Sequence, residues 1–164
     1  MRRIACWLAM ACSIGLTAHA AEVVVAQVSP ATGPLGPNGD ANYIGAKAYF
    51  DQINAQGGVA GQRIRFVRED DQYKPDETIR VMELVAQRDK PVAFVNALGS
   101  ANIAAVLKAG TLDKLAIPVV GVTPGADSPR SPGSRWMFHI QASDHAQLKR
   151  IVMHLSAMGI QRIA

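Results

Sequence analysis

The chain has 164 residues, of which 49% are apolar and 5% aromatic, with 17 basic and 13 acidic side chains and a formal net charge of +4. Two basic residues, Arg2 and Arg3, belong to an N-terminal segment with the features of an export signal, so the remaining chain carries a net charge of only +2. This balance gives no support to nucleic-acid binding, and no apolar run after residue 20 is long enough to cross a membrane.

Residues 1–20 have the three parts of a secretory signal. The two arginines supply the positive start, residues 4–16 are an almost unbroken apolar run, and Ala18-His19-Ala20 is a small-x-small cleavage site. A membrane-spanning helix needs about 20 apolar residues, more than this run supplies. We therefore expect cleavage after Ala20 and a periplasmic mature chain.

Both cysteines of the chain, Cys6 and Cys12, lie inside this signal. Cleavage removes them, which excludes disulfides, a thiol nucleophile and thiolate metal sites from the mature chain. Cys12 as a lipid-attachment site is a weaker alternative, because Ala9 stands where a bacterial lipobox usually has leucine.

The first half of the mature chain predicts two strand–helix units. Residues 22–28 are the first expected strand, and residues 41–56 a helix with one apolar stripe made of Tyr43, Ala46, Phe50 and Ile53. Two glycines at 57–58 end that helix, since glycine readily adopts the left-handed conformation of helix ends. Residues 62–69 are the second expected strand. Proline and two acidic residues begin the next helix, expected over 75–88.

The second half continues the alternation. Strands are expected at 91–98, 117–122 and 136–140, and helices at 100–109 and 143–158. The last helix has a continuous apolar stripe, formed by Leu148, Ile151, Val152, Leu155 and Met158. Strands that alternate with helices predict an α/β fold, a doubly wound parallel sheet with helices on both faces.

In such a sheet, ligands bind beyond the carboxyl ends of the strands. Three segments rich in small and polar residues follow expected strands there: 29–40, 98–102 and 121–127. Ser100 is expected at a helix N-cap, where unsatisfied N–H groups and the helix dipole attract a carboxylate. The alternative is that Ser100 only caps its own helix.

The other candidate positions have two interpretations each. Thr123 offers a hydroxyl and an N–H to a ligand, or it shapes a turn at Pro124-Gly125. Asn38 lines the cleft together with neighbouring glycines, or lies in a flexible connection. The full set of candidate ligand-binding residues is Asn38, Leu98, Gly99, Ser100, Asn102, Gly121, Thr123 and Gly125.

Motifs for cofactors or catalysis are weak. The glycines at 33, 36 and 39 lack the G-x-G spacing of a dinucleotide loop, and neither a phosphate-binding loop nor a nucleophile elbow is present. The acidic run 69–71 is either a metal site or a solvated strand end. Because no nucleophile, base and orienting group can be assembled, we expect no enzyme activity, cofactor or metal.

An ordered set of short motifs resembles a known family. Residues 32–36 (TGPLG), 45–54 (GAKAYFDQIN) and 57–61 (GGVAG) resemble the start of the leucine/isoleucine/valine-binding proteins, the type I periplasmic substrate-binding proteins of ABC importers. The similarity continues in order through Glu69-Asp70-Asp71, Leu98-Gly99-Ser100, 117–121, Gly125-Ala126 and Gly159-Ile160. It covers the whole mature chain.

This resemblance implies two α/β lobes, joined by a three-strand hinge, that close on an amino acid or a related small carboxylate. Residues 21–142 then form the N-terminal lobe, and residues 143–164 begin a second lobe that is truncated here. The family's first lobe holds the ligand carboxylate at positions that match Ser100 and Thr123–Gly125. Asn38 falls near a pocket aromatic of some relatives. Pro124 departs from the hydroxyl residue of close relatives, and Asn102 is a candidate substitute.

The resemblance further implies a binding protein that delivers its ligand to an ABC permease by lobe closure, as a monomer in its full-length form. The alternative is a module that senses the ligand for a receptor without transport. An exported α/β enzyme is a third possibility without positive evidence. With the second lobe missing, the apolar stripe of 148–158 is expected to be exposed, which favours poor stability and aggregation.

Overall fold

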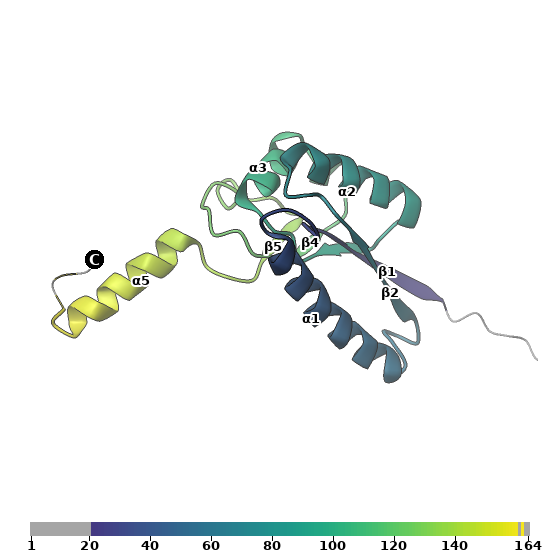
Figure 1. Ribbon diagram of the computed structural model, residues 1–164, viewed down its shortest axis with the longest axis horizontal. Coiled ribbons are helices and arrows are strands. Elements are labelled where there is room, and N and C mark those ends of the chain that lie inside the picture. Colours follow the sequence, from purple (N-terminus) through teal and green to yellow (C-terminus); the bar gives the residue numbers. More distant parts are fainter. Residues whose placement is uncertain (1–20, 161, 163–164) are drawn as a thin grey trace, which may run out of the picture.

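The computed structural model describes residues 21–160 and 162. The expected signal with its cleavage site and cysteines lies outside the described residues. Five parallel strands form one sheet, in the spatial order β2-β1-β3-β4-β5, with helices on both faces (Figure 1). The predicted fold class is confirmed.

The elements follow the expected alternation. They are β1 (Glu22–Val28), α1 (Gly36–Ala55), β2 (Arg63–Glu69), α2 (Pro75–Asp89), β3 (Ala93–Val95), α3 (Ser100–Lys108), α4 (Thr111–Leu115), β4 (Val119–Val122), β5 (Met137–His139) and α5 (Asp144–Ala157). The short helix α4 is the one element that the sequence did not predict.

Two element boundaries differ clearly from the prediction. Helix α1 begins at Gly36 rather than at residue 41, because Pro37 suits a first helical turn and the preceding glycines do not prevent it. Strand β3 has three residues rather than the predicted span of 91–98. Asn96 has φ of +55°, a left-handed conformation that ends the strand.

The chain order of the strands determines which helix covers which face. β1 lies between β2 and β3, so the chain moves one way across the sheet from β1 to β2 and the other way from β2 to β3. With right-handed crossovers, α1 therefore lies on one face and α2 with α3 on the other (Figure 1). The reversal of direction between β1 and β3 is the switch point at which open α/β sheets bind ligands.

The main core lies between the sheet and the α2–α4 layer. Phe94 of β3 is its largest side chain and is 2% exposed. The same core cluster contains buried side chains from all three helices and from three other strands, β1, β4 and β5, including Ala26, Val28, Val81, Met82, Val85, Ile103, Val106, Leu112, Val119, Val122 and Met137. Removal of these apolar surfaces from water is the main stabilising contribution to the fold.

The opposite face is packed mainly around Phe66 of β2. Tyr43 of α1 stacks on Phe66 with ring centroids 5.2 Å apart, and Phe50 meets the same ring edge-on at 5.0 Å. The predicted apolar stripe of α1 is thus confirmed. Val120 of β4 and its neighbour Phe138 of β5 remain 42% and 53% exposed. The helical cover of this face is therefore incomplete over β4 and β5.

Helix α5 extends away from the sheet and its layers (Figure 1). Ser143 caps it, because its Oγ accepts a hydrogen bond from Ala146 N at 3.3 Å. None of the residues of α5 is buried, and its apolar stripe is exposed, Leu148 by 61% and Met158 by 63%. The predicted exposure of this stripe is confirmed, while the expected aggregation stays a prediction.

Asn54 attaches α1 to the edge strand β2, and its replacement by alanine tests this contact. The Asn54 amide donates to Ile64 O at 2.9 Å and accepts from Ile64 N at 2.7 Å, so it satisfies both main-chain groups at the open edge of the sheet. We expect Asn54→Ala to lower the free energy of unfolding by about 1–3 kcal/mol. Urea denaturation measures this change. Gln52→Ala, on the exposed side of the same helix, is the control and should change little.

Candidate ligand-binding site

The candidate site lies at the carboxyl edge of the sheet. Because β1, β3 and β4 are neighbours and parallel, the segments that follow them lie side by side. These segments are Ser29–Leu35, Asn96–Gly99 and Thr123–Asp127. The turn that follows β2, residues 70–74, reaches the same edge. The predicted clustering of the three loops is a consequence of the confirmed topology.

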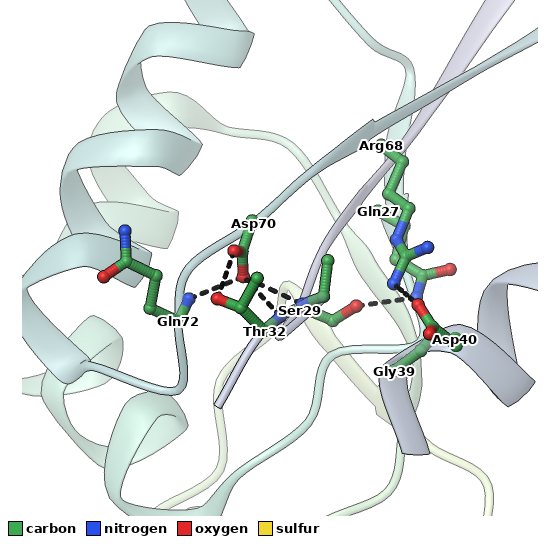
Figure 2. A network of polar contacts seen from close by, with 9 residues as sticks. Gln27, Ser29, Thr32, Gly39, Asp40, Arg68, Asp70 and Gln72 are labelled. Atoms are coloured by element: carbon green, nitrogen blue, oxygen red, sulfur yellow. Dashed lines mark hydrogen bonds and ion pairs between the residues drawn. The ribbon is translucent and has the colours of Figure 1, made fainter. Parts of the chain in front are cut away.

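The loop after β1 is held by Asp70 (Figure 2). The Asp70 carboxylate accepts hydrogen bonds from Ala31 N at 2.8 Å, Thr32 Oγ1 at 2.6 Å and Gln72 N at 2.8 Å. Partial burial of Asp70 opposes its ionisation, but these hydrogen bonds outweigh burial and lower the pKa of the carboxyl below its ordinary value. Within the acidic run, Asp70 thus links the loop after β1 to the turn after β2.

The lowered pKa of Asp70 predicts an acid-dependent loss of stability. A group whose pKa is lower in the folded state stabilises the fold above its unfolded pKa, about 4 for aspartate. That contribution is lost as the pH falls through the folded-state pKa. We therefore expect Asp70→Asn to reduce the unfolding free energy at pH 7 and to narrow the difference from wild type as the pH falls below about 4. Urea denaturation at a series of pH values measures both. A constant difference at all pH values would contradict the assignment.

The first turn of α1 packs closely on the loop after β1. Gln27, which is fully buried, donates to Ser29 Oγ at 2.7 Å and to Gly39 O at 3.3 Å (Figure 2). A Cβ atom on Gly39 would lie 1.8 Å from Pro30 O, so only glycine permits this approach. Asn38 lies in the same turn and is exposed. The segment predicted as a loop over 29–40 is therefore a loop only to Leu35.

The start of α3 presents main-chain donors. Gly99, rather than Ser100, is the N-cap residue, with φ of +99°, and Ser100 is the first residue of the helix. The predicted N-cap position of Ser100 is thus wrong by one residue, because glycine takes the strained turn. Among the described residues, the N–H groups of Ser100, Ala101 and Asn102 have no acceptor, and Ile103 N is the first to donate, to Gly99 O at 3.0 Å. Leu98 precedes this turn and is half-buried.

Asn102 does not face the open edge. It is 1% exposed, and its amide donates to Thr78 Oγ1 at 2.7 Å and to Asp71 Oδ2 at 3.4 Å. Thr78 Oγ1 in turn donates to Asp71 Oδ2 at 2.7 Å, and burial raises the pKa of the Asp71 carboxyl. The suggestion that Asn102 replaces a hydroxyl contact to the ligand is not consistent with this placement. Asn102 instead holds the first turn of α3 against Asp71 and Thr78 through these hydrogen bonds.

Tyr73 is a residue of this edge that the sequence did not indicate. Its N–H donates to Asp71 Oδ1 at 3.0 Å, and its φ of +60° is in the left-handed region. An added Cβ at Gly99 would lie 2.6 Å from Tyr73 Cε2 and 2.8 Å from Asn102 Oδ1. Gly99 is therefore enclosed between an aromatic ring and an amide. The rule that all carboxyl ends meet at one edge was the signal that could have found Tyr73.

The loop after β4 has its carbonyl groups occupied. Thr123 O accepts from the Gln141 amide, and Gly125 O accepts from Asp144 N at 2.8 Å. Pro124 O and Ala126 O both accept from the Arg130 guanidinium, at 2.9 and 3.3 Å. The N–H groups of Gly125, Ala126 and Asp127 have no acceptor within residues 21–160 and 162.

Thr123 and Gly121 both contact neighbouring main-chain or side-chain groups of the sheet, which the sequence alone did not predict. Thr123 N and Thr123 Oγ1 both donate to Ala97 O, at 3.3 and 3.2 Å, so this residue joins the ends of β4 and β3. Gly121 lies inside β4, not in the loop after it, and a Cβ there would be 2.9 Å from Asn96 Oδ1. Gly121 lines an apolar hollow of about 380 Å³ between α1 and the sheet, together with Tyr49, Phe50 and Ile140.

Within residues 21–160 and 162, no group of three or more His, Cys, Asp or Glu side chains could hold a metal ion. None of the helices among these residues combines the length and the hydrophobicity of a membrane span. The donors at the carboxyl edge, main-chain N–H groups and the Ser100 hydroxyl, suit a small anion such as a carboxylate.

The chain is similar to known proteins in sequence and in fold. A family model described as periplasmic binding protein matches residues 22–164. An amino acid binding protein of Pseudomonas aeruginosa is 30% identical over 85% of this chain, and a Leu/Ile/Val-binding protein of Citrobacter freundii is 34% identical over 46% of it. The crystal structure of an extracellular ligand-binding receptor from Verminephrobacter eiseniae is 34% identical over 85% of this chain, with a TM-score of 0.79.

The matches cover a minor part of each relative. The chain spans 37% of the Pseudomonas protein, 21% of the Citrobacter protein and 39% of the Verminephrobacter chain.

Proposed function

Because the chain belongs to the periplasmic binding protein family, with leucine/isoleucine/valine-binding proteins among its relatives, we propose that it is the solute-binding component of an ABC importer. The family is one of solute-binding proteins. The proposed ligand is an amino acid of the branched-chain type or a related small carboxylate. It is bound between two lobes, of which residues 21–142 form the first and residues 143–164 begin the second.

The observation that carries this proposal is a set of N–H donors at the carboxyl edge that have no acceptor in the part of the chain that the structure describes. The N–H groups of residues 100–102 point out of the start of α3, and those of 125–127 lie in the neighbouring loop. Oriented N–H groups at a helix N-terminus favour a negative charge, and each hydrogen bond to a charged group stabilises binding by about 1.5–3 kcal/mol. A free α-carboxylate fits such a set of donors.

The residues of the site have different proposed roles. Ser100 and Gly125 contact the carboxylate, the first with its hydroxyl and both with their N–H groups. Gly99, Leu98 and Thr123 shape the two loops, and Asn102 supports α3 from the buried side. Asn38, exposed at the first turn of α1, lies at the border of the site and contacts the rest of the ligand. Gly121 of β4 leaves room for the Asn96 side chain, because a Cβ atom at this position would lie too close to Asn96 Oδ1.

Ligand binding tests the proposal directly. We expect isothermal titration calorimetry on the protein expressed from its own gene to give saturable binding of one of L-leucine, L-isoleucine and L-valine. Ser100→Ala should weaken that binding about 10-fold or more, because one hydrogen bond to a charged group is lost. Ser128→Ala is the matched control, since Ser128 lies in the same half of the chain and lines a different hollow. Saturable binding of none of the three, and of no other small carboxylate, would refute the proposal.

Two further parts of the proposal concern the cell. Export by the signal predicts a periplasmic protein whose N-terminal residue is Ala21, which N-terminal sequencing measures. Delivery to an ABC permease predicts that deletion of the gene abolishes uptake of the bound ligand. Normal uptake with a lost response to the ligand would instead support the alternative, a sensing module without transport.

A further inference from the structure

Neither the motifs nor the loop pattern of the sequence indicated Arg130 as part of the site. Its guanidinium contacts the carbonyl groups of the loop after β4. Arg130 is half-buried. Its Nη2 donates to Pro124 O at 2.9 Å and its Nε to Ala126 O at 3.3 Å. Among the described residues it forms no ion pair with a carboxylate. The planar guanidinium thus holds two carbonyl groups of one short loop in fixed positions.

The direction of these carbonyl groups determines the direction of the free N–H groups. In a trans peptide unit the C=O of one residue and the N–H of the next point in opposite directions. Arg130 holds Pro124 O and Ala126 O, so the N–H groups of Gly125 and Asp127 point away from the guanidinium. The peptide between Gly125 and Ala126 is held separately, because Asp144 N donates to Gly125 O at 2.8 Å.

The surroundings of Arg130 agree with a permanent positive charge at this place. His139 of β5 has a pKa below its ordinary value, first because of burial and second because of the nearby Arg130 charge. Both causes disfavour a second positive charge, on the His139 imidazole, next to the Arg130 cation. A positive charge beside an anion site raises its affinity for a carboxylate, and here it also offsets the negative charge of the Asp144 carboxylate, which lies against Gly125.

We propose that Arg130 is the positioning residue of the carboxylate site: it clamps Pro124 O and Ala126 O so that the N–H groups of Gly125 and Asp127 are directed at the ligand. The inference rests on the proposed function, since it takes a carboxylate as the ligand. Arg130 itself does not contact the ligand, and acts through the loop.

The test compares two probes that differ in the carboxylate. L-leucine has it, and leucinamide replaces it by a neutral amide. In Arg130→Met we expect the Kd of L-leucine to rise about 10-fold or more, as for the loss of a hydrogen bond to a charged group, and the Kd of leucinamide to change by less than about threefold. Arg130→Lys keeps the charge without the planar fork, so its effect on L-leucine should be intermediate.

Arg135→Met is the matched control. Arg135 lies in the same segment, is exposed and has its guanidinium 4.7 Å from the ring centroid of Trp136. It should change neither Kd. Equal weakening of both probes in Arg130→Met would overturn the inference, because it would indicate a general structural role. Unchanged binding of L-leucine in that variant would overturn it as well.

A measurement without ligand separates this inference from the proposed function. The amide resonances of Gly125 and Asp127 in ¹⁵N-labelled protein should shift in Arg130→Met and stay in place in Arg135→Met. If wild type binds neither probe and these resonances shift, the proposed leucine-type ligand is wrong and the clamp is supported. If the resonances do not shift, the clamp is refuted whatever the ligand is.

Discussion

Replacement of Gly39 by alanine is expected to lower the free energy of unfolding by about 3 kcal/mol or more. The new Cβ atom would lie 1.8 Å from Pro30 O and 2.9 Å from Pro30 C. Both are main-chain atoms, so the first turn of α1 or the loop after β1 has to move as a whole, and overpacking of this kind costs about 1–3 kcal/mol or more. The movement also breaks the bond from Gln27 to Gly39 O. Urea denaturation measures the loss.

Gly45 of the same helix is the matched control, with an effect of opposite sign. It is exposed, and a Cβ atom added there has no neighbour within 4 Å. Alanine is the better helix former, so Gly45→Ala should stabilise the protein by about 0.5–1 kcal/mol. If both variants change stability in the same direction, the close approach of α1 to Pro30 is not the cause of the Gly39 effect.

Replacement of Gly99 by alanine is expected to have the second large effect, on stability and on ligand binding together. The φ of +99° is strained for any residue with a side chain, and the added Cβ would lie 2.6 Å from Tyr73 Cε2 and 2.8 Å from Asn102 Oδ1. We expect a loss of about 2–4 kcal/mol in the free energy of unfolding. Because the first N–H groups of α3 move, the Kd of L-leucine should rise at least about 10-fold.

Two companion variants separate strain from contact at Gly99. Gly110→Ala has a left-handed φ of +66° and no neighbour within 4 Å, so it gives the cost of left-handed backbone without a contact, about 1–2 kcal/mol. Gly99, with φ of +99° and ψ of 115°, lies outside that region, so its strain should be at least as large. In the double variant Gly99→Ala, Tyr73→Ala the ring is removed, and the two changes should couple favourably, as expected for residues in contact. If the changes in unfolding free energy of the two single variants add up to that of the double variant, Tyr73 does not contact the added Cβ atom at Gly99.

The hydrophobic pattern of the sequence was sufficient to predict the fold and the edge of the sheet at which the candidate site lies. Strand β1 and helix α2 lie within a residue of their predicted limits. The reason is that a run of β-branched residues marks a strand buried on both faces, and an apolar stripe at helical spacing marks a helix buried on one face. Parallel order and right-handed crossovers then require the loops after β1, β3 and β4 to meet.

The errors occurred where main-chain conformation overrides pattern. The left-handed Asn96 shortened β3, and the N-cap of α3 is Gly99 rather than the serine that usually takes this position. In both cases the residue type permits several conformations, and tertiary contacts select one of them.

Hydrophobic periodicity alone predicts the α/β architecture, the faces of its helices and the edge at which a ligand is expected. The contacts of Asn102 with Asp71 and Thr78, of Tyr73 with Gly99, and of Arg130 with two carbonyl groups of a loop become visible only in the folded chain. The reason is physical. Periodicity reports whether a side chain leaves water, a property of its own element. A hydrogen-bond partner is set by the meeting of segments far apart in the chain, and main-chain carbonyl groups, which every residue has, leave no mark in the sequence.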